Sequence, residues 1–271
     1  IVKMFSSTFW TGWPYNLLNG NYFLSNDVPE SYLLINLFYK SPEYIILLYL
    51  SFFILIFSSK NFFVKKFKFF FYKILFLILI LAFPNLLLFF IPFPVYDGMR
   101  LFLWIVPYFC IIPGLTIYYF IENISSFKSK FFLVFSSAIF VYFLYNFILL
   151  TPYQYTYLNA FSGKAENRYQ KFENDYWSAS LKELIDEVNF KNDKVITIAT
   201  CGASLGLSEK YFKEKDFYNI KFVSSADADY IIMTNRVVNQ NNIINCFDKF
   251  KGSNISQVER NGLILSVIRK I

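Results

Sequence analysis

The sequence has 271 residues, of which 56% are hydrophobic and 23% aromatic, and this composition predicts a membrane protein because soluble domains are seldom so aromatic. The formal net charge is +7, but the lysines gather beside apolar runs, which indicates membrane orientation rather than binding to nucleic acid. The chain has no histidine and three scattered cysteines, which excludes histidine bases, histidine metal ligands and zinc-finger motifs.

Residues 1–41 are amphipathic and irregular, with tryptophan and tyrosine alternating with asparagine and glycine. Rings with a polar tip suit the boundary between membrane and water, so this segment is expected to lie along a membrane surface. Within it, residues 27–32 predict a turn that leads into a short helix. The next helix has Ser41 as its expected N-cap, Pro42 at its first position and Glu43 at the positive end of its dipole.

Residues 42–150 are expected to form a transmembrane region. They contain four apolar runs, each close to the ~20 residues that cross a hydrocarbon layer of ~30 Å. The runs are residues 42–59, 74–93, 101–121 and 131–150. Prolines within the second and third runs predict kinks, which neighbouring helices tolerate in lipid.

The lysines predict which ends of these helices face the cytoplasm. The connection between the first two runs carries five lysines between residues 60 and 73 and no acid, and the connection before the fourth run carries Lys128 and Lys130. Both connections are expected in the cytoplasm by the positive-inside rule. The N-terminal segment, residues 92–100 and everything after Leu150 then lie on the opposite, extracytoplasmic side of an inner membrane.

Residues 151–271 read as a small extracytoplasmic α/β domain. The predicted elements are a helix at 178–189, a strand at 194–200, a helix to 211, strands at 220–224 and 230–233, a helix at 241–250, and a hairpin of strands 255–259 and 263–268. Asp175 is the expected N-cap of the first helix, and Asn261-Gly262 is typical of a type I′ turn. The fold class we predict is therefore membrane all-α, with about four transmembrane helices, followed by an α/β domain.

The segment Tyr96-Asp97-Gly98-Met99-Arg100 precedes the third run. Arg100 could hold the phosphate of a lipid-linked substrate, because a guanidinium binds phosphate oxygens in a bidentate way. Asp97 could then orient Arg100 or bind a sugar hydroxyl. The structural alternative is that Asp97 caps the helix and that Arg100 extends to the membrane interface.

Glu173 and Asp175 lie two residues apart within a stretch rich in tyrosine and tryptophan. Paired carboxylates could act on a glycosidic bond, but capping of a helix or binding of hydroxyls is the interpretation we prefer. The aromatic residues around them fit either a membrane interface or a sugar-binding surface. Cys201 and Cys246 would lie in an oxidising compartment, so a disulfide and two buried thiols are both open. Gly202–Gly206 reads as an ordinary strand-to-helix turn.

The motifs at residues 96–100, 152–159 and 175–177 together resemble the C-terminal half of bacterial glycosyltransferase family 39 proteins. These are related to protein O-mannosyltransferases and to the lipid A aminoarabinose transferase, which share the GT-C membrane fold. The resemblance covers most of residues 10–180. Related sequences carry a histidine directly after the arginine, where this chain has Leu101.

The resemblance implies an enzyme of hexosyl or mannosyl type that moves a sugar from a polyprenyl-phosphate carrier to an extracytoplasmic protein, lipid or glycan. The family's catalytic aspartate lies near the N-terminus of the full protein, so no residue of this fragment is expected to be the catalytic base. The residues that the resemblance places at the donor phosphate or at the rim of the cavity are Arg100, Asp97, Tyr153, Gln154, Tyr157, Asn159, Asp175 and Tyr176. The expected partners are the lipid-linked donor and membrane lipids, with no cofactor, metal or nucleic acid. The alternative function is non-enzymatic, a membrane-anchored extracytoplasmic domain that binds a partner or a glycan.

A labelling experiment tests this topology. A cysteine introduced by Lys66→Cys should resist membrane-impermeant thiol reagents in intact cells, because the lysine-rich connection faces the cytoplasm. A cysteine introduced by Ser253→Cys should react. The reverse pattern would overturn the orientation.

Overall fold

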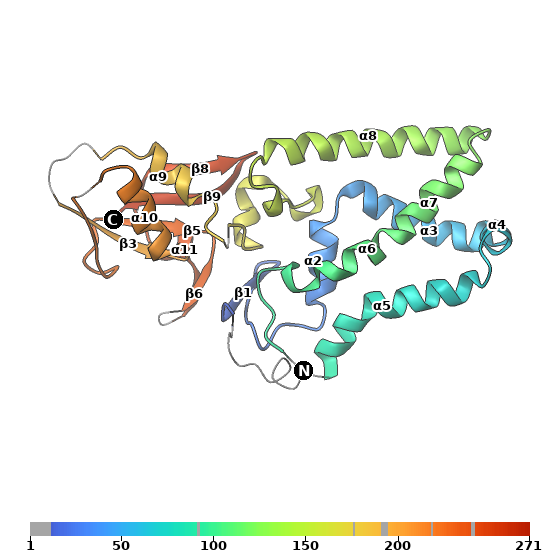
Figure 1. Ribbon diagram of the computed structural model, residues 1–271, viewed down its shortest axis with the longest axis horizontal. Coiled ribbons are helices and arrows are strands. Elements are labelled where there is room, and N and C mark those ends of the chain that lie inside the picture. The colour runs from blue at the N-terminus through green and yellow to red at the C-terminus, as the bar shows by residue number, and fades with distance from the viewer. Residues whose placement is uncertain (1–11, 91–92, 176, 191–194, 218, 240–241) are drawn as a thin grey trace. The chain divides into compact units, whose positions relative to one another are not determined.

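The computed structural model describes residues 12–271 except residues 91–92, 176, 191–194, 218 and 240–241 (Figure 1). The chain divides into two compact units. The helical unit comprises Asn26–Ile148 and Leu158–Phe161, and the α/β unit comprises the segment that ends at Ser25 together with Leu149–Tyr157 and Ser162–Ile271. Residues 12–25 thus belong to the α/β unit and residues 26–41 to the helical unit.

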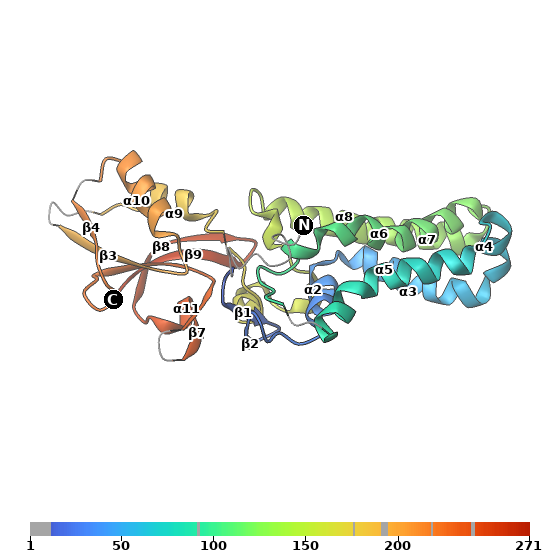
Figure 2. The same cartoon turned by 60° about the horizontal axis from the view of Figure 1, so that its bottom comes forward.

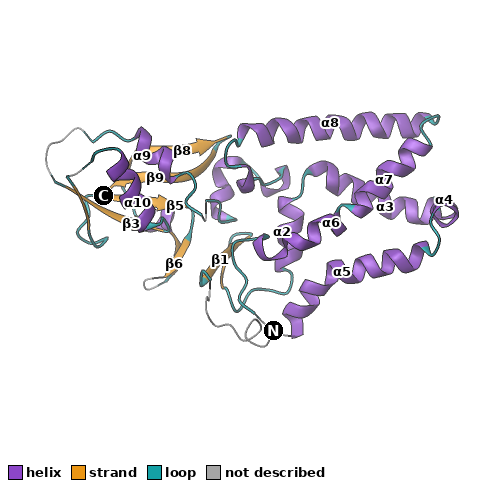
Figure 3. Ribbon diagram, in the orientation of Figure 1, coloured by secondary structure: helices purple, strands orange, loops and turns teal. Residues whose placement is uncertain are grey.

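The helical unit contains seven α-helices and one 3₁₀ helix within the part of the chain that the structure describes (Figure 3). They are α2 (Tyr32–Lys40), α3 (Glu43–Ser58), α4 (Lys60–Lys66), α5 (Phe70–Phe90), η1 (Arg100–Ile105), α6 (Val106–Phe109), α7 (Ile111–Glu122) and α8 (Phe127–Leu149). Three segments are long and apolar enough to cross a membrane, namely α5, the run from η1 to α7, and α8. A fourth is added if α2 and α3, which meet at a bend of 112°, count as one span.

The bend between α2 and α3 originates at Pro42. A residue before proline is disfavoured in the helical conformation, and Ser41 accordingly has extended backbone angles of −80° and 138°. Ser41 is thus the C-cap of α2, with its N–H donating to Leu37 O at 3.0 Å, and Pro42 is the N-cap of α3. The prediction of Ser41 as the N-cap of the second helix was wrong for this reason.

The third apolar run is broken rather than kinked. It starts in the 3₁₀ conformation of η1 and continues through α6 and α7, with Pro107 in the first turn of α6 and Pro113 in the first turn of α7. Proline lacks the N–H that an α-helix interior needs but is tolerated in a first turn, so each proline sits at the start of a new helix. Pro84, by contrast, lies inside α5.

Two contacts place both lysine-rich connections at one end of the helical unit. Lys66 Nζ lies 2.8 Å from Glu122 Oε2, and the Ser59 and Tyr119 hydroxyls lie 2.8 Å apart. Figures 1 and 2 show α4 at this end and α2 at the opposite end of the unit. The shared end that the lysine pattern required is therefore present, and its side of the membrane stays a prediction.

The transmembrane-length helices present much apolar surface. The most apolar stretch of α8 has only 6% of its residues buried within the protein, and that of α5 has 22%. Side chains such as Phe131, Val134 and Tyr145 on α8 are more than half exposed. So large an apolar surface requires lipid or further helices to cover it.

The α/β unit is built on a five-stranded sheet with the strand order β4-β3-β5-β9-β8. The strands are β3 (Ile196–Cys201), β4 (Ile220–Phe222), β5 (Tyr230–Thr234), β8 (Ser253–Arg260) and β9 (Leu263–Lys270). β3 pairs in parallel with β4 and β5, whereas β5–β9 and β8–β9 are antiparallel. A fold of membrane-length helices with a mixed α/β region is thus present, as the sequence predicted.

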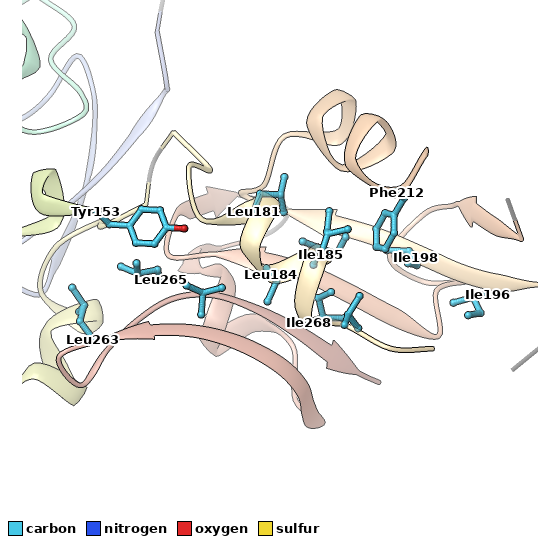
Figure 4. Packing of buried hydrophobic residues seen from close by; sticks show 13 residues of the cluster. Tyr153, Leu181, Leu184, Ile185, Ile196, Ile198, Phe212, Leu263, Leu265 and Ile268 are labelled. Carbon is cyan, nitrogen blue, oxygen red and sulfur yellow. The ribbon is translucent and has the colours of Figure 1, made fainter. Parts of the chain in front are cut away.

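Helices cover both faces of this sheet (Figure 2). On one face, α9 (Leu181–Glu187) and α10 (Leu205–Glu214) bury a core against the strands, and Figure 4 shows the α9 side chains directed toward Leu265 and Ile268. On the other face, α11 (Cys246–Lys249) packs with the alternate residues of the strands, among them Ala199 and Val267. The period of two along β3 and β5 therefore supplies two cores.

The hairpin at the C-terminus is confirmed. Asn261 and Gly262 have positive φ values of 49° and 77°, as a type I′ turn requires. The helix expected at 241–250 was wrong over its first half, where β7 (Ile243–Asn245) pairs with β6 (Val237–Asn239). The helix α11 starts only at Cys246, after Asn245 accepts a hydrogen bond from Phe247 N–H at 2.9 Å.

A second short hairpin was missed in the N-terminal segment. Its strands are β1 (Tyr15–Leu18) and β2 (Asn21–Leu24), and they belong to the α/β unit. Trp13 Nε1 donates to Val237 O at 2.9 Å, and Gly20 N–H donates to Lys171 O at 3.1 Å. Partners more than 150 residues away thus stabilise a segment whose own pattern is irregular.

Cys201, the last residue of β3, forms a disulfide with Cys246 at the start of α11. The hypothesis that these two cysteines pair is therefore confirmed, and Cys110 is a free, exposed cysteine. The disulfide joins the sheet to the helix on its second face.

We expect reduction of this disulfide, or the double substitution Cys201→Ala and Cys246→Ala, to lower the free energy of unfolding of the α/β unit by about 4 kcal/mol. This follows from the entropy of closing a loop of 45 residues in the unfolded chain. Urea unfolding with and without reductant measures the change, and Cys110→Ala is the matched control. An unchanged midpoint, or equal thiol counts before and after reduction of the unfolded protein, would contradict the pairing.

Candidate functional site

The turn that precedes the third span holds a buried carboxylate against a half-exposed guanidinium. Asp97 is only 4% exposed, and Arg100 Nη1 donates to its Oδ2 at 3.2 Å, while the Arg100 side chain is 40% exposed. Asp97 is not the N-cap of η1, because that position is Met99 and no side chain caps the helix. The carboxylate therefore orients Arg100, as one of the two interpretations of the sequence proposed.

A second cation, which the sequence did not single out, lies against the same turn. Gly98 has a φ of +62°, and a Cβ at this position would lie 2.5 Å from Lys40 Nζ and 3.3 Å from Asn36 Oδ1. Lys40 is the last residue of α2, and Asn36 lies one turn before it and is 2% exposed. The C-terminal end of α2 and the turn at residues 96–100 thus bring two basic side chains to one end of the helical unit.

Asn159 connects the chain that follows α8 to this end of α2. Its side-chain Nδ2 donates to Phe38 O at 2.6 Å and to Ser41 O at 3.0 Å, and its backbone N–H donates to Tyr39 O at 2.9 Å. The next residue, Ala160, donates its N–H to Glu43 Oε1 at 2.7 Å. Asn159 is fully buried, so its amide holds the α2–α3 junction rather than facing a cavity.

An apolar groove of about 590 Å³ lies in the helical unit along α2, α3 and α5. Its lining includes Leu34 and Leu37 of α2, and the few polar groups at it include Glu30 and Asn85. The Oδ1 atom of Asn85 is buried without a hydrogen-bond partner among the described residues. A groove of this size is in the range of pockets that hold apolar ligands with a few polar contacts.

Tyr153 belongs to the core of the α/β unit. The ring is 5% exposed within the main hydrophobic cluster (Figure 4), and its hydroxyl donates to Glu183 Oε2 at 2.8 Å. Arg260 Nη2 donates to both oxygens of Glu183, at 2.6 and 2.7 Å, and its Nε donates to Thr151 O at 3.0 Å. Burial, followed by the bond to Glu183, raises the pKa of Tyr153 above its ordinary value of 10.0.

Asp175 and Glu173 also hold the α/β unit together. Asp175 is fully buried and accepts from the N–H groups of Ala179 and Ser180 at 2.7 and 3.0 Å, and from the hydroxyl of Tyr155. Glu173 Oε1 accepts from the N–H of Val237 at 2.9 Å. Asp175 therefore binds the amides at the start of α9, although the N-cap position itself is Ser180 and the helix starts at Leu181, later than predicted.

The remaining candidates that the structure describes fall into the same unit. Tyr157 is 7% exposed, and Gln154 donates its Nε2 to Thr151 Oγ1 at 2.8 Å. Tyr176 lies outside the described residues. The structure thus brings Asp97 and Arg100 together in the helical unit with Asn159 at the α2–α3 junction of that unit, and it places the other described candidates in the α/β unit. Among the described residues, no group of three or more acidic or cysteine side chains could hold a metal ion.

Comparison of the chain with protein-family models, with curated proteins and with solved structures finds no match. Any function must therefore be argued from the residues and from their arrangement.

The contacts of Tyr153 predict how Tyr153→Phe changes stability. Loss of the hydrogen bond to an ionised carboxylate should lower the free energy of unfolding by about 1–2 kcal/mol at pH 7. Because the pKa of Tyr153 is raised in the folded state, its contribution is fully present below pH 10 and is lost as the pH rises above 10. The free energy of unfolding of the Tyr153→Phe variant should therefore fall less than that of the unaltered protein as the pH rises above 10. Urea unfolding at pH 7 and above pH 10 measures both effects, with Tyr142→Phe on the exposed face of α8 as the control. Equal stability of the variant and the unaltered protein would contradict the role of the Glu183 contact.

Proposed function

We propose that the chain is part of an integral-membrane glycosyltransferase that moves a sugar from a polyprenyl phosphate to an extracytoplasmic acceptor. The observation that carries the proposal is the Asp97–Arg100 pair at the start of a span-length run of helices. The turn that holds the pair lies against Lys40 at the end of α2, and α2 lies at the end of the helical unit opposite to α4. The positive-inside rule predicts that this end faces the extracytoplasmic side. The resemblance to glycosyltransferase family 39 supports the same reaction.

Arg100 is the group proposed to bind the phosphate of the donor. Its guanidinium presents several N–H donors in a plane that matches phosphate oxygens, and about two fifths of the side chain is exposed for such contact. Asp97 holds the guanidinium from its buried side. Because the guanidinium is already oriented, it needs little reorganisation when negative charge develops on the phosphate.

The proposed reaction is a displacement at the anomeric carbon of the sugar. The acceptor oxygen forms a bond to this carbon, and the electron pair of the broken bond stays on the phosphate oxygen of the carrier. The acceptor proton passes to a carboxylate base, which the family resemblance places outside these 271 residues. Arg100 stabilises the negative charge that the leaving phosphate gains.

The apolar groove supports a lipid carrier rather than a water-soluble donor. Leu37 lines the groove and lies three residues before Lys40, which is about 4.5 Å along the axis of α2. An isoprenoid tail in the groove could thus reach the basic turn with its phosphate. Burial of each CH₂ group contributes about 0.8 kcal/mol, so even a few isoprene units would add useful affinity.

We expect Arg100→Ala in the full-length protein to lower sugar transfer from a polyprenyl-phosphate donor by about 100-fold or more, because a pre-oriented donor to the leaving oxygen is lost. The amount of protein inserted in the membrane should not change. Arg100→Lys should keep part of the activity, and Lys128→Ala in the connection before α8 is the control. Unchanged turnover in the Arg100→Ala variant would remove Arg100 from the mechanism and favour a non-enzymatic binding role.

A further inference from the structure

We propose that Lys40 is a second phosphate-binding cation of the turn at residues 96–100, and that it makes this site prefer a phosphate monoester to a phosphate diester. The inference rests on the proposed function, since it concerns the same turn. It goes further in naming a residue, a charge state of the ligand and a consequence for the reaction. Three observations carry it.

The first observation is the fit between Gly98 and the Lys40 ammonium. Gly98 has a positive φ, which side chains other than glycine rarely adopt, and the space for a Cβ is taken by Lys40 Nζ. The turn therefore brings the ammonium close to backbone that leads within two residues to Arg100. A surface lysine at a helix C-terminus does not need such a close contact with the backbone, because water and the helix dipole suffice to stabilise it.

The second observation is that the backbone on both sides of Lys40 is fixed. The amide of Asn159 binds the carbonyl groups of Phe38 and Ser41, and its N–H binds that of Tyr39. Asn36, one turn before Lys40, is buried and donates its Nδ2 to Tyr32 O at 2.9 Å. Asn159 thus fixes the backbone from which the Lys40 side chain extends.

The third observation is the balance of charge. Lys40 and Arg100 contribute two positive charges, and Asp97 on the same turn contributes one negative charge. Glu43, on the neighbouring helix α3, adds a further negative charge, and its Oε1 accepts a hydrogen bond from the N–H of Ala160. Lys40 and Arg100 attract an anion more strongly as the charge of that anion increases.

The two forms of the carrier differ in this charge. The phosphate of a sugar-linked carrier is a diester with one negative charge, whereas the released carrier is a monoester with a charge of about −1.5 to −2 at pH 7. As the bond between the anomeric carbon and the phosphate oxygen breaks, its electron pair adds this second charge. A cation that binds the monoester better than the diester therefore stabilises the transition state more than it stabilises the bound sugar-linked carrier. This difference raises kcat rather than lowering KM.

Binding of two short isoprenoid probes to the purified protein in detergent tests the proposal. The probes are farnesyl phosphate, a monoester, and farnesyl methyl phosphate, a diester. Lys40→Met should weaken binding of the monoester by about tenfold and binding of the diester by about threefold or less. The reason is that only the monoester carries a second negative charge for the Lys40 ammonium to bind. Lys40→Arg should restore most of the preference.

Two further variants serve as controls. Lys65→Gln removes an exposed lysine at the other end of the helical unit and should change neither affinity. Gly98→Ala keeps every charge but places a Cβ 2.5 Å from the ammonium, so the lysine side chain must shift, and the monoester preference should fall by less than in Lys40→Met. Thermal melting of each variant verifies that it is folded.

The outcomes separate this inference from the proposed function. Equal loss for both probes, no loss for either, or no binding of farnesyl phosphate to the unaltered protein would overturn the role of Lys40. Loss of sugar transfer in Arg100→Ala together with unchanged probe binding in Lys40→Met would leave the proposed function and reject the inference. A Lys40-dependent monoester preference without any sugar transfer would leave the phosphate site and reject the glycosyltransferase.

Discussion

The helical unit depends on the break in the backbone that Pro42 enforces. Because Ser41 cannot continue the helix before a proline, α2 ends at Lys40 and α3 leaves at a sharp angle. Helix ends expose carbonyl groups that need hydrogen-bond donors. Asn159 supplies such donors to the carbonyl groups on either side of Lys40, and this junction in turn sets where the ammonium of Lys40 meets Gly98. One covalent constraint thus leads to the position of a charge.

The distribution of charge follows two different physical rules at the two ends of this unit. At one end, lysines are numerous and exposed. Their contacts include the surface ion pair Lys66–Glu122, which contributes little stability, and cation–π contacts such as that of Lys60 with Phe71. At the other end, two basic side chains lie beside a buried carboxylate, that of Asp97, and beside Gly98, where the Lys40 ammonium leaves no room for a Cβ. These basic residues are Lys40 and Arg100. The first arrangement suits orientation in a membrane, and the second suits recognition of an anion.

Features set by local patterns could be predicted from the sequence. The apolar runs gave the long helices to within a few residues, since length and hydrophobicity alone define them, and Asn261-Gly262 gave its hairpin because both positions need positive φ. The hairpin of β1 and β2 and the strand β7 could not be predicted in this way, because strands of three or four residues depend on distant partners. Lys40 escaped notice for the same reason. Its one signal in the sequence was a lysine at the end of the N-terminal segment, on the side that the positive-inside rule disfavours.

The motifs that carry the family resemblance divide into two kinds once their contacts are known. The Tyr153 hydroxyl, the Asp175 carboxylate and the Asn159 Nδ2 bind other parts of the protein, and these residues are almost completely buried. Replacing any one of them would leave buried partners unsatisfied, so loss of activity in such variants would report on folding as much as on chemistry. Arg100 differs because much of its side chain is exposed while Asp97 fixes its direction. Substitution of Arg100 can therefore separate the proposed contact with a phosphate from a contribution to the fold, and the turn at residues 96–100 is where the proposed reaction is best tested.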